Sequence, residues 1–247
     1  MPLPSSRTVP ATMAERLIVA LDVPSVEAAR EAVSRIGGVV RFYKIGYWLL
    51  FAPGAEAFLD RLLAAGNRVF LDAKMYDIGE TVKQGAARAA ERGVSFLTVH
   101  GDPEILRAAV AGRGASPTLQ ILAVTVLTSL NAAGLAEMGY GGDLASLVAE
   151  RARSAAEAGC DGIIASAADD PARLRAAAGA PGLLVVTPGI RPAGGATDDH
   201  KRPASPAEAV ARGADYLVIG RPILRAADPA AAASAVIAEM ERGAGGG

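Results

Sequence analysis

The sequence between residues 68 and 100 reads RVFLDAKMYDIGETVKQGAARAAERGVSFLTVH and contains one full repeat of the pattern that decides the fold. An apolar run at 68–72 precedes an Ala/Glu/Arg-rich stretch at 80–92, then Gly93 and a second apolar run at 94–99. Short, nearly continuous apolar runs between helical stretches are typical of parallel strands covered on both faces. Glycine is favoured just past a helix end, which is where Gly93 stands. The stretch therefore predicts a strand, a helix and a second parallel strand.

This unit recurs along the whole chain of 247 residues. The apolar runs are 16–22, 39–45, 68–72, 94–99, 119–126, 161–165, 183–187 and 215–219. The helical stretches are 25–36, 54–65, 80–92, 103–112, 143–158, 169–178, 206–212 and 229–242. Eight strand–helix units in about 250 residues predict an α/β protein, a single-domain (β/α)₈ TIM barrel. The alternative, a doubly wound open sheet, would have a glycine-rich turn after its first strand, where this chain has LDVPS at 21–25.

Composition excludes several classes of partner. The net charge of −1, with charges interspersed along the chain, indicates no nucleic-acid partner. No apolar run approaches the ~18–20 residues of a membrane span, and residues 1–13 lack the apolar region of a signal peptide. With one cysteine, Cys160, and two histidines, a Cys/His zinc site is not expected. We expect a cytoplasmic protein with no membrane contact, flexible tails at 1–13 and 243–247, and a barrel domain at 14–242.

The segment DAKMYD at 72–77 is the most informative candidate site. The active site of a barrel lies at the C-terminal ends of its strands, where this segment falls. Side chains alternate along a strand, so Asp72 and Lys74 should point to the same side, with Asp77 in the following loop. Lys44 ends the preceding strand, and two lysines with two aspartates would form an alternating array that keeps each ammonium protonated. The alternative is a surface ion pair at a strand exit.

A second candidate site lies at the ends of the last two strands. TPGIR at 187–191 ends the seventh run, and GRPI at 220–223 ends the eighth. The loops after strands 7 and 8 are the usual phosphate site of these barrels. Arg221 would supply charge-assisted donors there. The alternative is a pair of Gly/Pro turns with an incidental arginine.

Taken together, these segments resemble the orotidine 5′-monophosphate decarboxylase family from about residue 16 to 225. The family's central D-x-K-x-x-D-I motif is present as DAKMYDI at 72–78, followed by GETV at 79–82, where many relatives read PNTV. The other matching segments, in order, are ALD at 20–22, YKIG at 43–46, LTS at 127–129, TPGIR at 187–191 and IGRPI at 219–223.

The resemblance implies decarboxylation of orotidine 5′-monophosphate to uridine 5′-monophosphate, the last step of de novo UMP synthesis, with no cofactor and no metal. It implies that Lys74 protonates C6 of the pyrimidine and that Asp72 faces the substrate carboxylate. Asp22 and Lys44 would hold the ribose hydroxyls. A fixed ammonium beside C6 would stabilise the carbanion as it develops.

The resemblance also implies how the rest of the substrate is held. The residues in question are Thr128 and Ser129 at the pyrimidine, and Arg191, Gly220 and Arg221 at the phosphate. Asp77 and Thr81 reach the neighbouring subunit's site in this family, so a homodimer is implied. The chain departs from the family at His200, where a glutamine usually bridges pyrimidine and phosphate; His200 is either a substitute ligand or a solvated loop residue.

Two other functions compete with this one. Mg²⁺-dependent sugar-phosphate decarboxylases and aldol-type synthases of the same superfamily share the D-x-K-x-x-D segment. They usually have a metal-binding carboxylate where this chain has Lys44, and an ammonium at that position disfavours Mg²⁺. The second rival is a non-catalytic phosphate-binding barrel, against which both Asp72 and Lys74 argue.

Overall fold

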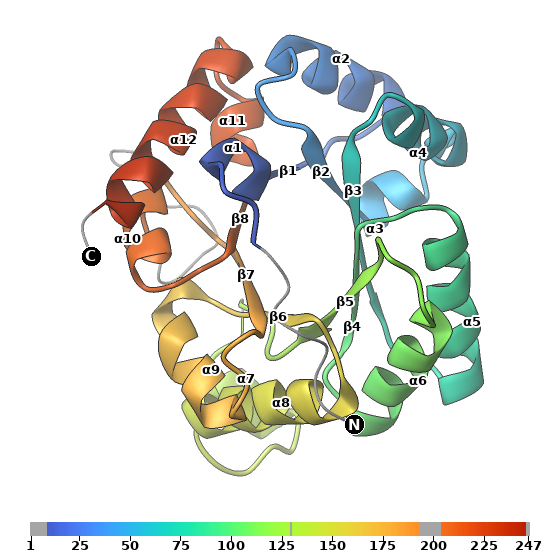
Figure 1. The fold of residues 1–247 in the computed structure, drawn as a ribbon, viewed down its shortest axis with the longest axis vertical. Helices are drawn as coiled ribbons and strands as arrows, with labels where there is room; N and C mark the ends of the chain where they lie inside the picture. The colour runs from blue at the N-terminus through green and yellow to red at the C-terminus, as the bar shows by residue number, and fades with distance from the viewer. Residues whose placement is uncertain (1–8, 129, 193–203, 246–247) are drawn as a thin grey trace.

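Eight parallel strands form a closed barrel in sequence order in the computed structural model, which describes residues 9–128, 130–192 and 204–245 (Figure 1). The strands are β1 Leu17–Ala20, β2 Phe42–Gly46, β3 Arg68–Met75, β4 Phe96–His100, β5 Gln120–Val124, β6 Gly162–Ile164, β7 Leu184–Pro188 and β8 Tyr216–Ile219. The predicted single-domain (β/α)₈ TIM barrel is confirmed. The doubly wound sheet is excluded because β8 pairs with β1, with Leu17 opposite Leu217 and Val19 opposite Ile219.

Helices form a ring around the barrel (Figure 1). Those that follow strands as predicted are α2 Val26–Ile36, α4 Ala55–Ala64, α5 Gly79–Glu91, α6 Pro103–Arg113, α8 Leu144–Ala158, α9 Pro171–Ala178, α10 Pro206–Ala211 and α12 Pro229–Ala244. The short additional elements are α1 Met13–Arg16, α3 Tyr47–Leu50, α7 Ala132–Glu137, α11 Arg221–Leu224 and the 3₁₀ turn η1 Ala167–Asp169. These are too short to produce an apolar periodicity in the sequence. No helix in the described part of the chain is long and apolar enough to cross a membrane.

Local sequence signals account for the ends of these helices. The Ser25 hydroxyl accepts a hydrogen bond from the backbone of Ala28 at the start of α2, and Ser205 forms a capping box with Glu208 at the start of α10. Gly37 and Gly159 end α2 and α8 with φ of 63° and 81°, a left-handed conformation that glycine adopts without strain.

The barrel interior is a packed core and not a channel. Phe42, Phe70, Phe96 and Tyr216 are buried in one inward-facing cluster. Arg68, the first residue of β3, places its guanidinium 4.1 Å from the centre of the Phe42 ring, over this cluster. Because the interior is filled, only the rim at the strand ends is left for a ligand.

Candidate active site

A cleft of about 700 Å³ opens at the C-terminal ends of the strands. Eight predicted site residues line it, namely Asp22, Lys44, Asp72, Lys74, Thr128, Arg191, Gly220 and Arg221. They come from the ends of six strands that are far apart in the sequence. The cleft also has lining residues that sequence reasoning did not select, among them Trp48 and Arg225.

Four charged side chains form an alternating row in the cleft. Lys44 Nζ lies 3.1 Å from Asp22 Oδ1 and 3.2 Å from Asp72 Oδ2. Lys74 Nζ donates to Asp72 Oδ1 at 2.8 Å. Asp72 is therefore held between two ammonium groups. The second aspartate of the row within one chain is Asp22, which the sequence analysis had placed at the ribose and not in the array.

The row keeps its inner members charged. Burial raises the pKa of Asp72, but Lys44 and Lys74 together with two hydrogen bonds outweigh it, so its pKa lies below the usual value. Burial lowers the pKa of Lys44, but the carboxylates of Asp72 and Asp22 outweigh this effect, so its pKa lies above the usual value. At neutral pH the carboxylate of Asp72 is ionised and the ammonium of Lys44 is protonated.

Strand β3 is longer and less regular than predicted. The predicted strand ends at residue 72, but β3 continues to Met75, with a register shift against β4 between Leu71 and Met75. Lys74 lies within this irregularity and has a φ of 38°, in the left-handed region that non-glycine residues avoid. Strand alternation correctly placed Asp72 and Lys74 on one side, although the backbone that joins them is distorted.

The segments after β7 and β8 bring three arginines to the cleft. Arg191, Arg221 and Arg225 all line it. The backbone there runs close to β1, because a Cβ added at Gly220 would lie only 3.3 Å from the carbonyl oxygen of Ala20. The cleft thus has the alternating charge row at the ends of β1, β2 and β3, and three arginines in the segments after β7 and β8.

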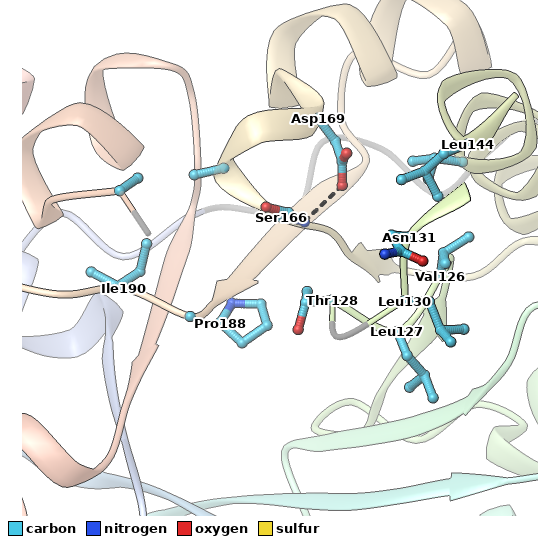
Figure 2. A pocket seen from close by; sticks show the side chains of 14 residues that line it. Val126, Leu127, Thr128, Leu130, Asn131, Leu144, Ser166, Asp169, Pro188 and Ile190 are labelled. Carbon is cyan, nitrogen blue, oxygen red and sulfur yellow. Dashed lines mark hydrogen bonds between the residues drawn. The ribbon is translucent and has the colours of Figure 1, made fainter. Parts of the chain in front are cut away.

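A smaller pocket adjoins the cleft beside Thr128 and Pro188, which line both. Figure 2 shows its other walls, with Asn131 on one side and Ile190 on the other. At its edge the backbone N–H of Ser166 donates to Asp169 at 3.0 Å, closing the turn after β6. The pocket lies next to the position predicted for the pyrimidine.

Comparison with known proteins assigns the family. The model of the Orotidine 5′-phosphate decarboxylase / HUMPS family matches residues 15–236. The chain belongs to this family. A protein named Orotidine 5′-phosphate decarboxylase from Methylorubrum extorquens (strain PA1) is 53% identical over 227 residues, which cover 92% of this chain and 96% of the relative. One of the same name from Afipia carboxidovorans is 53% identical over 232 residues, covering 94% of this chain and 97% of that relative.

A solved structure agrees with the family's fold. The crystal structure of Orotidine 5′-phosphate decarboxylase from Lactobacillus acidophilus superposes with a TM-score of 0.80 at 33% identity. The superposition covers 92% of this chain and 99% of that one.

Four residues singled out by resemblance to the orotidine 5′-phosphate decarboxylases are not in the described cleft. Asp77 and Thr81 are exposed, in the loop after β3 and on α5, and are not among its described lining residues. Ser129 and His200 lie outside the described residues. Within the described part of the chain, no group of three His, Cys, Asp or Glu side chains is placed to hold a metal ion.

Proposed function

We propose that this chain decarboxylates orotidine 5′-phosphate to uridine 5′-phosphate in the cytoplasm, as the last step of de novo pyrimidine synthesis. The observation that carries the proposal is the position of Lys74, whose ammonium lies 2.8 Å from Asp72 in a cleft that three arginines also line. Such a cleft matches a substrate that carries both a carboxylate and a phosphate. A phosphate-binding barrel without activity would have no need of the buried charge row.

The chemistry follows from a fixed charge beside the reacting carbon. As the bond from C6 to the carboxyl group breaks, its electron pair stays on C6 and CO₂ leaves. The Lys74 ammonium stabilises that carbanion and then transfers a proton to C6, so that the lysine is left neutral and takes up a proton from water. Asp72 faces the departing carboxylate and holds Lys74 in place, while Lys44 and Asp22 bind the ribose hydroxyls.

The remaining substrate contacts are assigned by position. Thr128 and Ser129 contact the pyrimidine, and Arg191, Gly220 and Arg221 bind the phosphate. His200 stands where the family's bridging glutamine is expected and supplies at most part of that contact.

The assay for this function is the loss of orotidine 5′-phosphate absorbance with purified protein and excess EDTA. We expect full activity after dialysis against EDTA and no gain on adding Mg²⁺. Lys44 supports this expectation, because its ammonium lies within 3.2 Å of both Asp22 and Asp72, where a metal-dependent relative would hold a cation. Folded protein that leaves the absorbance unchanged would refute the proposed function, and activity that needs Mg²⁺ would favour the metal-dependent class.

Replacing Arg221 with alanine tests the phosphate end. We expect kcat/KM for orotidine 5′-phosphate to fall about 10- to 100-fold, because hydrogen bonds between charged groups are lost. Orotidine, which lacks the phosphate, should be turned over by the variant within about twofold of the unmodified rate. Arg242→Ala, an exposed change on α12, is the matched control and should alter neither substrate. An equal loss with both substrates would contradict phosphate binding by Arg221.

We further propose that the active form is a homodimer in which Asp77 and Thr81 of each subunit complete the other's site. The exposed position of both residues supports this. Tyr76 and Ile78, on either side of Asp77, are 68% and 72% exposed. Tyr47 and Trp48 of α3 add to this apolar surface, and the Tyr47 hydroxyl donates to the Ala73 carbonyl of β3, which joins the two segments. An apolar surface of this kind around a functional residue fits a second copy of the chain.

A further inference from the structure

Thr98 is a fully buried polar residue that forms hydrogen bonds with both Asp72 and Lys74 of the charge row. It lies on β4, and its hydroxyl donates to Asp72 Oδ1 at 2.9 Å. The Thr98 hydroxyl oxygen also accepts a hydrogen bond from the backbone N–H of Lys74 at 3.0 Å. The direction of each bond is fixed, because an ionised carboxylate only accepts and a backbone N–H only donates.

These bonds close a ring around the distorted part of β3. Asp72 Oδ1 accepts from both the Thr98 hydroxyl and Lys74 Nζ, and the Lys74 backbone returns to Thr98. Because the register shifts at this point, Lys74 is not in a regular pairing position against β4, and its backbone N–H donates to the Thr98 hydroxyl. A residue in a sparsely populated backbone conformation persists only where its surroundings hold it there.

We propose that Thr98 is a positioning residue for the decarboxylation: through one hydroxyl it holds the Lys74 backbone in its left-handed conformation and fixes the Asp72 carboxylate beneath the Lys74 ammonium. The inference rests on the proposed function and adds a residue to it. Threonine suits this role because its branched side chain has few rotamers, so the hydroxyl is aimed before substrate arrives.

Loss of the Thr98 hydroxyl is expected to slow the chemical step. Without it, Lys74 relaxes toward an ordinary strand conformation and its ammonium moves away from C6. Arg221 and the phosphate end of the cleft are not touched by the change. We therefore expect kcat to fall while the binding of uridine 5′-phosphate is retained.

Two matched pairs of proteins isolate the hydroxyl. Threonine and Thr98→Val have nearly the same shape, and Thr98→Ser and Thr98→Ala differ by one hydroxyl, so the second pair decides the question if the valine variant does not fold. In each pair we expect the form without the hydroxyl to have a kcat about 10- to 100-fold lower, the effect of one hydrogen bond to a charged group. KM and the dissociation constant of uridine 5′-phosphate should change less than about threefold.

Thr125→Val is the control for a buried threonine in general. Thr125 is as buried as Thr98, and its hydroxyl donates to the carbonyl of Ile164 at 2.8 Å, away from the charge row. We expect its kcat to stay within about twofold of the unmodified protein. A folded Thr98→Val with unchanged kcat, or serine and alanine variants of equal kcat, would overturn the inference while the proposed function stands. An unmodified protein without decarboxylase activity would overturn both.

Discussion

Replacing Lys74 with alanine is expected to lower kcat by at least about 10⁴-fold, because one ammonium both stabilises the carbanion and donates its proton. Uridine 5′-phosphate should still bind, since Arg191 and Arg221, which line the cleft from the segments after β7 and β8, remain in place. The measurements are single-turnover decarboxylation and a titration of uridine 5′-phosphate. A loss of turnover together with retained binding distinguishes a catalytic group from a residue that only holds the substrate.

Lys83→Ala is the matched control for this variant. Lys83 is about half exposed on α5, where it lies 3.7 Å from Glu80, and it does not line the cleft. Its removal should leave both kcat and binding within about twofold of the unmodified values. A Lys74→Ala protein that still turns over at more than about 1% of the unmodified rate would contradict proton donation by Lys74.

Combining subunits with different substitutions is expected to restore activity that neither variant has alone. Homodimers of Lys74→Ala or of Asp77→Ala should both be inactive or nearly so. A heterodimer with one substitution in each chain contains one site with an intact Lys74 and the partner's intact Asp77. It should therefore show about half of the unmodified activity per dimer. Co-expression with two affinity tags and tandem purification supplies the heterodimer for the assay.

The control places the same two substitutions in one chain and pairs it with an unmodified chain. Each site of that dimer then lacks either Lys74 or the partner's Asp77, and we expect almost no activity. If Asp77 instead served its own subunit, the two results would be reversed: the control dimer would keep half of the activity and the first heterodimer would have none. Both dimers contain the same two substitutions, so a difference in their activity shows which subunit uses Asp77.

The sequence predicted the fold well because the repeat is carried by many residues at once. All eight strands and all eight major helices are present, since apolar runs and caps such as Ser25 and Ser205 act locally. The end of β3 was missed because Asp72 and Lys74 interrupt the apolar run, and apolar content was the signal used to define strands. A strand that extends into an active site loses its apolar pattern at the residues that line the site.

The site was predicted less completely, for a physical reason that Thr98 illustrates. In FLTV at 96–99 a threonine is an ordinary β-branched strand residue, and nothing local shows that it faces Asp72 on the neighbouring strand. The left-handed backbone conformation of Lys74 could not be predicted from the sequence either, because it depends on contacts with that strand. Lys74 is nevertheless two residues from Asp72 along the strand, and this spacing was enough to predict that the two side chains lie on the same side.

The pairing of β1 with β8 has a consequence for synthesis of the chain on the ribosome. Val19 meets Ile219, a partner made 200 residues later, so at about 5–20 residues per second the first strand waits roughly 10–40 s for it. During that time the nascent sheet has two open edges whose backbone groups can pair with another chain. Met240 on α12 joins the same buried cluster as Leu17, so that part of the core also forms only after residue 240 has been made.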